Sequence, residues 1–235
     1  MKHIVIASTS TLFGGEYLDY LTEPMKELFQ DCSEILFIPY ARPGGISHED
    51  YTLTVSEAFS KLDIKVVGIH EFENPKNALK EAKGIFVGGG NTFVLVHQIY
   101  KHNLMETLRK VVYDGTPYLG TSAGSNICGL TMQTTNDMPI IHPPSFKTLG
   151  LVPFNINPHY LDPDKNSQHM GETRETRIKE FHSINTIPVV GLREGSWLEV
   201  LGNSITLNGL LTARIFETNK APYELDAGTF LNDLK

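Results

Sequence analysis

The pentapeptide GTSAG at residues 120–124 matches the pattern G-x-S-x-G. This pattern is typical of a serine on a sharp turn between a strand and a helix, where small neighbours relieve crowding and the hydroxyl projects from the sheet. A strand is predicted directly before it, at 116–119, and a helix start directly after it. The chemistry indicated is nucleophilic attack by Ser122, which the positive end of the following helix favours. A glycine- and serine-rich turn without chemistry is the alternative.

A second glycine cluster, Gly88 to Gly90, follows the strand predicted at 84–87. In a parallel sheet this loop and the serine turn both lie at the carboxyl ends of the strands, where sites form. An amide of this loop, together with that of Ala123, could stabilise an oxyanion. The rival interpretation is a phosphate-binding loop. Neither of the two common glycine-rich phosphate patterns is present in this cluster, which weakens that rival.

A nucleophilic serine needs a general base, and nine histidines compete for that role. His159 lies downstream of the serine in an irregular segment, although a single histidine is more often structural. A carboxylate should orient the imidazole ring. Two candidates are Asp137, in the irregular segment, and Glu194, which follows a predicted strand and precedes a glycine. For either one, a carboxylate that serves only a turn or a cap is the alternative.

Two arginines, Arg174 and Arg177, lie at the start of a predicted helix. Arginines on helices usually form solvated ion pairs with residues three or four positions away, here Glu175 or Glu180. An arginine held by an active-site loop could instead bind a carboxylate through two hydrogen bonds.

Predicted strands and helices, which would position these residues, alternate along the first half of the chain. Strands are predicted at 4–7, 35–39, 65–69, 84–87 and 118–120. Helices are predicted at 17–29, 49–62, 77–82, 92–100 and 104–113. This spacing predicts right-handed crossovers and a doubly wound, mostly parallel α/β sheet that is covered on both faces.

The pattern changes after Gly124. Residues 131–170 are rich in Pro, Asn, Asp and His and show little periodicity, and a loop of this length is usually functional. Further along, a helix is predicted at 172–182 and strands at 189–192, 197–200, 204–207 and 213–216. The last three strands are separated by short turns and predict an antiparallel meander at one edge of the sheet. Because no linker or repeat interrupts the chain, we expect one domain over residues 1–235.

The composition is that of an ordinary globular protein, with 40% hydrophobic and 20% charged residues. A formal charge of −7 disfavours general binding to nucleic acid or to anionic membranes. The two cysteines form no disulfide framework or zinc motif, and no apolar run is long enough to span a membrane. These features lead us to expect a cytoplasmic protein. They leave the oligomeric state open, a homodimer included.

Seven segments, in this order, resemble the peptidase E family of α-aspartyl dipeptidases. They lie at 8–12, 88–93, 120–126, 134–140, 157–159, 171–177 and 194–195. The resemblance implies an α/β domain related to the class I glutamine amidotransferase fold. It also implies hydrolysis of short peptides whose first residue is aspartate, without a metal or cofactor.

The resemblance also implies roles for individual residues. Ser122 is the nucleophile and His159 the base. Glu194 falls where the family places the third member of its triad. Asp137 falls where an alternative has been argued, and we expect it to position His159 or the α-amine of the substrate. The order Ser, His, Glu differs from that of α/β-hydrolases.

The remaining roles that the resemblance implies are stabilisation of the oxyanion and binding of the substrate. Gly90 and Ala123 fall on the oxyanion positions, and Arg174 matches the arginine that reads the aspartyl carboxylate. We also expect Asn91 to contact the substrate. Thr121 and Ser125 depart from the family pattern, in which tryptophan and alanine are common, and we expect them to alter the shape of the pocket.

Two rivals remain at this point. A hydrolase of the same architecture could release acidic residues from a storage polymer such as cyanophycin. A non-catalytic module could use the same glycine loops to bind an acidic metabolite. Metal-dependent hydrolysis is disfavoured, since H-E-x-x-H is absent and the histidines lack the spacing of metal ligands.

Overall fold

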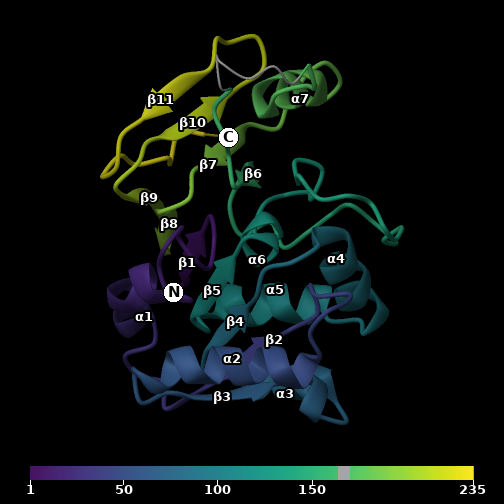
Figure 1. Ribbon diagram of the computed structural model, residues 1–235, viewed down its shortest axis with the longest axis vertical. Helices are drawn as coiled ribbons and strands as arrows, with labels where there is room; N and C mark the ends of the chain where they lie inside the picture. Colours follow the sequence, from purple (N-terminus) through teal and green to yellow (C-terminus); the bar gives the residue numbers. More distant parts are fainter. Residues whose placement is uncertain (164–169, 235) are drawn as a thin grey trace.

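A seven-stranded sheet forms the centre of the larger part of the computed structural model, which describes residues 1–163 and 170–234 (Figure 1). Its strand order is β3-β2-β4-β5-β1-β8-β9. Neighbouring strands from β3 to β1 run parallel, whereas β8 and β9 extend the sheet in antiparallel fashion. The strands are β1 (His3–Ala7), β2 (Glu34–Ile38), β3 (Lys65–Gly68), β4 (Ile85–Val87), β5 (Tyr118–Thr121), β8 (Ser196–Leu201) and β9 (Ser204–Gly209).

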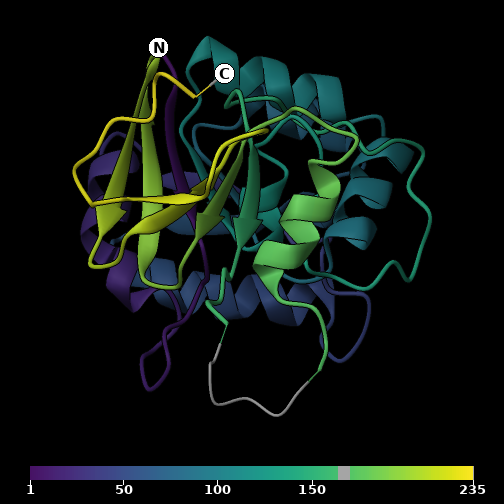
Figure 2. The same ribbon diagram turned by 90° about the horizontal axis from the view of Figure 1, so that it is seen from above.

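Side chains of the central strands alternate between two apolar cores, one on each face of the sheet. In β1, Ile4 and Ile6 contribute to one core, and Val5 and Ala7 to the other. Figure 2 shows helices on both sides of the strands. The first core is covered by α3 (Pro75–Glu81), α4 (Thr92–Lys101) and α5 (Met105–Asp114), and the second by α1 (Thr22–Leu28) and α2 (His48–Ser60). Short helices are η1 (Asp19–Leu21), η2 (Ile69–Glu71) and α6 (Ala123–Asn126).

A second sheet of four strands lies at the end of the molecule opposite α2 and α3 (Figure 1). Its order is β11-β10-β7-β6, and only β6 and β7 run parallel. The strands are β6 (Asn155–Pro158), β7 (Val189–Leu192), β10 (Ala213–Phe216) and β11 (Tyr223–Leu225). Helix α7 (Arg174–Phe181) packs on this sheet through Ile178, which joins a cluster with Tyr160, Val189 and Phe216.

The predicted fold class, a mostly parallel α/β sheet with antiparallel strands near the C-terminus, is confirmed. Two details of the prediction are wrong. The helix expected over 17–29 starts only at Thr22, because Leu18 has a φ of 60°, which no α-helix accommodates. The expected meander is broken, since β10 leaves β9 and pairs with β7 in the second sheet. Within the described ranges, no helix has the length and apolar character that a membrane crossing needs.

Candidate active site

Ser122 occupies the turn between β5 and α6 with a φ of 53° and a ψ of −110°. This conformation is rare for a residue with a side chain and is typical of strained, functional positions. Its glycine neighbours are needed for space. A Cβ on Gly124 would collide with the carbonyl of Val87, and one on Gly120 with the carbonyl of Gly124. The sequence therefore folds into a tight elbow that presents the Ser122 hydroxyl at the edge of the sheet.

The two departures from the family pattern, Thr121 and Ser125, lie inside the protein. Both side chains are fully buried, so neither is exposed on a pocket surface, and any effect on the shape of the pocket would act through the packing of the elbow. The Ser125 hydroxyl lies within hydrogen-bonding distance of the carbonyl oxygens of Ala7 (2.6 Å) and Gly120 (2.7 Å). It therefore ties the elbow to the ends of β1 and β5.

The glycine loop after β4 lies against the elbow. A Cβ on Gly89 would lie 2.9 Å from the Cβ of Ser122, so only glycine allows this approach. Gly90 has a φ of 143°, again a conformation that favours glycine. Among the described residues, no backbone carbonyl accepts a hydrogen bond from the amide of Gly90 or of Ala123. Both amides are thus available to a ligand beside Ser122.

His159 follows directly after β6 and has a φ of 53°. Its backbone amide donates to the Ser8 hydroxyl at 2.8 Å, and that hydroxyl donates to the carbonyl of Leu192 at 2.7 Å. Ser8 thereby links the ends of β1, β6 and β7. The sequence led us to expect no role for Ser8, although this residue directly follows the first predicted strand.

The side chains of Ser122, His159 and Glu194 form one hydrogen-bonded series. The Ser122 Oγ lies 2.8 Å from Nε2 of His159, and Nδ1 of His159 lies 2.6 Å from Oε1 of Glu194. The imidazole can thus accept a proton from the hydroxyl on one side while donating its other N–H to a carboxylate. Chemically, the series is suited to activating the serine as a nucleophile.

Strand pairing explains why His159 and Glu194 meet. β6 and β7 are parallel neighbours, and Pro158 lies opposite Leu192. The residues that follow each strand therefore emerge side by side. In the same way, Ala7 lies opposite Thr121, which brings Ser8 and Ser122 together at the ends of β1 and β5.

Asp137 makes no described hydrogen bond or ion pair with His159. Its Oδ2 accepts hydrogen bonds from the backbone amide of Thr92 at 2.7 Å and from the hydroxyl of Thr135 at 2.9 Å. A carboxylate at the first turn of α4 is favoured by the helix dipole. The carboxylate within hydrogen-bonding distance of Nδ1 is that of Glu194, so of the two roles expected for Asp137 the described contacts leave only the binding of the substrate's α-amine.

Asn91 caps the same helix. Its Oδ1 accepts from the amide of Val94 at 3.1 Å, and its Nδ2 donates to the carbonyl of Met138 at 2.9 Å. With both ends of the side-chain amide occupied by the protein, the expected contact with substrate has no structural support. Asn91 instead fixes the loop that carries Asp137 over the start of α4.

Arg174 and Arg177 differ in their surroundings. Burial lowers the pKa of Arg174, the charge of Arg177 lowers this pKa further, and the nearby Asp137 opposes both effects. Arg174 is therefore partly buried and close enough to Asp137 to interact with its charge. Arg177 is more exposed and lies 3.8 Å from Glu172. The ion pairs expected with Glu175 or Glu180 are absent from the described contacts of both arginines.

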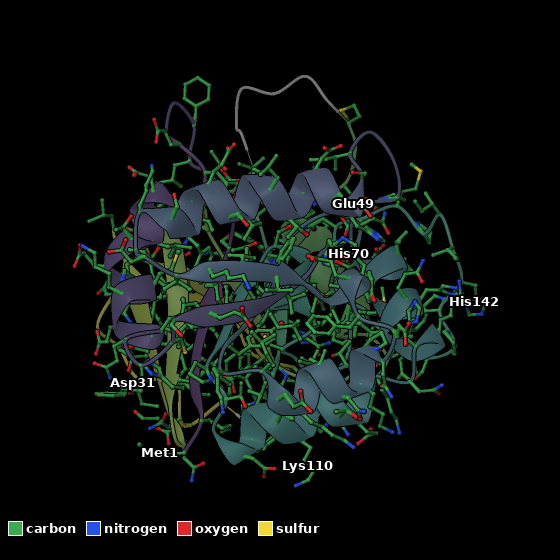
Figure 3. The ribbon with its side chains drawn as sticks, turned by 90° about the horizontal axis from the view of Figure 1, so that it is seen from below. Met1, Asp31, Glu49, His70, Lys110 and His142 are labelled. Atoms are coloured by element: carbon green, nitrogen blue, oxygen red, sulfur yellow. The ribbon has the colours of Figure 1, made fainter. Side chains whose placement is uncertain are left out.

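No other described histidine offers a comparable arrangement. Figure 3 shows His70 beside Glu49, and their closest side-chain atoms are 3.6 Å apart. Both ring nitrogens of His70 are buried without a hydrogen-bond partner, so this pair cannot relay a proton as His159 can. His3 lies 3.6 Å from Glu199 in a similar loose pair. His159 is thus the histidine with a serine at one nitrogen and a carboxylate at the other.

A chain of ion pairs connects the two segments that carry Glu194 and Arg174. It runs from Asp162 through Arg193, Glu224 and Arg214 to Glu175, with closest distances of 2.8, 2.8, 3.0 and 2.8 Å. Arg193 precedes Glu194, and Glu175 follows Arg174. The network therefore joins the strand end that carries the orienting carboxylate to the helix that carries Arg174.

Glu224, at the middle of this chain, gives the network a dependence on pH. Burial alone would raise the pKa of Glu224, but hydrogen bonds from Arg193, Thr212 and Arg214 outweigh it and lower the pKa from 4.5 to about 2. The ionised carboxylate thus stabilises the fold at neutral pH, and this contribution is lost as the pH falls from about 4.5 towards 2.

We expect Glu224→Gln to lower Tm by a few degrees at pH 7 and to flatten the fall of Tm below pH 5. Thermal melts followed by circular dichroism between pH 3 and pH 7 provide the measurement. Glu23→Gln, which removes an exposed pair with Lys26, serves as the control and should change little. Equal melting curves for Glu224→Gln and the wild type would contradict the stabilising role.

This α/β scaffold, with a serine elbow hydrogen-bonded to a histidine and a glutamate, defines a serine-hydrolase type of site. Residues 4–208 match the family model described as Peptidase family S51. The chain belongs to this family and is a serine peptidase, which confirms the family resemblance seen in the sequence. The non-catalytic alternative is thereby set aside.

Relatives of similar sequence agree with this assignment, and a solved structure agrees with the fold. A Peptidase E of Streptomyces coelicolor is 47% identical over 232 residues, 99% of this chain and 94% of the relative. A probable alpha-aspartyl dipeptidase of Drosophila melanogaster is 43% identical over 95% of this chain and 93% of its own length. A crystal structure of a putative Peptidase E from Listeria monocytogenes covers 90% of this chain and 100% of its own, with a TM-score of 0.67 and 20% identity. At that identity the likeness concerns the fold.

Proposed function

We propose that this peptidase hydrolyses the peptide bond after an N-terminal aspartate in short peptides. The observation that carries the proposal is the hydrogen-bonded series from Ser122 through His159 to Glu194. The names of the relatives from Streptomyces coelicolor and Drosophila melanogaster support the choice of substrate.

The chemistry begins at the Ser122 hydroxyl. Its Oγ attacks the carbonyl carbon of the aspartyl residue while Nε2 of His159 takes the proton. Glu194 accepts the Nδ1–H and stabilises the imidazolium that forms. His159 then gives the proton to the leaving amine, the C–N bond breaks, and an aspartyl ester remains on Ser122. A water molecule, deprotonated by the same nitrogen, hydrolyses the ester.

Negative charge develops on the carbonyl oxygen during each addition step. The amides of Gly90 and Ala123 are the donors we assign to this oxyanion, because both lie beside Ser122 and lack a described backbone acceptor. Ala123 is also the first residue of α6, so its amide belongs to the set that a helix leaves unpaired.

Selection of aspartate rests on Arg174 and Asp137, which carry opposite charges in the same region. An N-terminal aspartate has a negative side chain and a positive α-amine. We assign the side-chain carboxylate to the guanidinium of Arg174 and the α-amine to the carboxylate of Asp137. This pairing explains how a protein of net charge −7 could favour an acidic residue.

Arg174 supplies the test of this substrate preference. We expect kcat/KM for Asn-Xaa dipeptides to be lower than for Asp-Xaa by a factor of roughly thirty to several thousand, because losing the charged partner of a desolvated arginine costs about 2–5 kcal/mol. Arg174→Met should remove most of this discrimination. Arg177→Met, which changes the more exposed arginine on the same helix, is the matched control and should keep it.

Equal kcat/KM for Asp-Xaa and Asn-Xaa in the wild type would overturn the role of Arg174. A parallel incubation with an aspartate-bearing storage polymer tests the rival substrate. Release of residues from the polymer without cleavage of dipeptides would overturn the proposed dipeptidase activity.

A further inference from the structure

The carbonyl oxygen of Gly89 accepts two hydrogen bonds from side chains. Nε of Arg42 donates to it at 3.2 Å, and the hydroxyl of Tyr51 donates to it at 3.2 Å. Arg42 follows β2 and Tyr51 lies in α2, so the two donors come from different elements. They also contact each other, since Cζ of Arg42 lies 5.1 Å from the centre of the Tyr51 ring. A cation and a hydroxyl are thus directed together at a single backbone oxygen of the glycine loop.

Tyr51 is firmly packed in this position. The residue is 2% exposed, and its ring meets that of Phe37 in β2 edge-on, with ring centres 4.9 Å apart. A Cβ on Gly88 would lie 2.5 Å from the hydroxyl oxygen of Tyr51, so only glycine lets the hydroxyl come this close to the loop. The contact between the tyrosine and the glycine loop is therefore part of the core and does not depend on a mobile surface side chain.

The held carbonyl belongs to the peptide unit between Gly89 and Gly90, whose N–H is the donor we assign to the oxyanion. In a planar trans peptide the N–H points away from the C=O, and none of the described peptide bonds is cis. Because the carbonyl is turned to Arg42 and Tyr51, the Gly90 N–H points away from these two side chains. No described backbone carbonyl accepts a hydrogen bond from it. Gly89 itself lies against Ser122, so the free N–H is next to the nucleophile.

The next amide along the chain is fixed as well. The N–H of Asn91 donates to the carbonyl of Ala41 at 2.7 Å, and Ala41 directly precedes Arg42. Gly90 therefore lies between two held groups, the carbonyl of Gly89 and the amide of Asn91. A donor that is fixed in advance needs no reorganisation when negative charge forms, which is the condition for effective electrostatic stabilisation. The charge of Arg42 also polarises the peptide and strengthens its N–H as a donor.

We propose that Arg42 and Tyr51 are positioning residues of the oxyanion site. By holding the carbonyl of Gly89, they keep the Gly90 N–H directed at the oxygen that becomes negative when Ser122 attacks. In this role neither side chain needs to touch the substrate, because both act through the peptide unit. This inference rests on the proposed dipeptidase function and adds the residues that prepare its oxyanion donor.

The test measures kcat and KM for an Asp-Ala dipeptide in Arg42→Met, Tyr51→Phe and the double variant. Methionine keeps much of the length of arginine, and phenylalanine keeps the ring that packs on Phe37. We expect kcat to fall about tenfold in each single variant and about a hundredfold in the double variant, within the roughly 10²- to 10³-fold cost of losing an oxyanion donor outright. KM should stay within about twofold, because the oxyanion is absent from the bound ground state.

A transition-state analogue separates this role from a general loss of structure. With an aldehyde analogue of aspartate, Oγ of Ser122 adds to the carbonyl carbon while its proton passes to His159. The aldehyde oxygen then carries negative charge in the same site. The inhibition constant of this aldehyde should rise by a factor similar to the fall in kcat.

Arg109→Met and Tyr100→Phe are the matched controls. Nε of Arg109 donates to the carbonyl of Leu149 at 2.8 Å, and the hydroxyl of Tyr100 donates to the carbonyl of Lys147 at 2.9 Å. These variants lose the same kinds of hydrogen bond at carbonyls outside the glycine loop, so their kcat should match that of the wild type.

Thermal melts establish that each variant is folded. A folded double variant that loses less than about tenfold in kcat, or one in which only KM changes, would overturn the positioning role and leave the dipeptidase function in place. An equal fall of kcat in the two controls would overturn it as well. If the wild type cleaves no Asp-Xaa dipeptide, the proposed function fails and the positioning role fails with it.

Discussion

Replacing Ser122 by alanine is expected to lower kcat for an Asp-Xaa dipeptide by about 10⁴-fold or more, because no other group can form the acyl intermediate. His159→Ala should cause a loss of similar size. The double variant should be little worse than either single one, since the two residues act as a unit. Steady-state hydrolysis of one dipeptide by all three variants provides the measurement.

Folding must be intact for this comparison to count. Alanine keeps the Cβ of Ser122 and removes only its hydroxyl, so the strain of the turn is unchanged, and thermal melts should match the wild type within a few degrees. A folded Ser122→Ala protein that keeps more than a tenth of the wild-type kcat would contradict the assignment of the nucleophile.

Glu194→Gln is expected to lower kcat by about 10³- to 10⁴-fold. Glutamine keeps the length of the side chain and can still contact Nδ1, but it cannot stabilise the imidazolium and it allows the wrong tautomer of the ring. The loss should appear in kcat rather than in KM, because the substrate does not touch this carboxylate in the proposed mechanism. The pH dependence of kcat should also change, since the base loses its charged partner.

Asp137→Asn is the comparison that separates the two carboxylates. Because Asp137 binds the start of α4 rather than His159, we expect its replacement to raise KM through weaker binding of the α-amine and to reduce kcat much less. If Asp137→Asn lost as much kcat as Glu194→Gln, or if Glu194→Gln kept wild-type kcat, Glu194 would no longer be the orienting residue.

Local patterns in the sequence were sufficient for the elements that depend on nearby residues. The elbow around Ser122 could be predicted because strand, small residues and helix start follow one another along the chain. The parallel sheet could be predicted from alternating strands and helices. Helices α4 and α5 lie within one residue of their expected bounds at each end.

The choice between Glu194 and Asp137 depends on pairing between distant segments, which local patterns do not encode. β6 has one strongly apolar residue, Ile156, between two asparagines, so the sequence predicts an irregular segment there. Without β6, its parallel pairing with β7 could not be foreseen, and neither could the meeting of His159 with Glu194. The ion-pair chain behind the site depends on the same second sheet.

Local patterns in the sequence also do not show which side chains near the nucleophile face the solvent and which face the protein interior. Thr121, the last residue of β5, and Ser125, in α6, lie near the nucleophile in sequence but have fully buried side chains. Asn91 likewise follows the glycine loop but serves as a helix cap. Residues that lie close to a reactive residue along the chain therefore do not all face the substrate.

The most direct test of the account is the identity of the residue that carries the acyl group. An activated ester of aspartate, such as its p-nitrophenyl ester, makes acylation fast and should give a burst of nitrophenol of about one per active site. After acid quenching, peptide mapping by mass spectrometry should find the aspartyl group on Ser122, and the Ser122→Ala variant should show neither burst nor adduct. An adduct on another residue, or a burst that persists in the variant, would contradict the account.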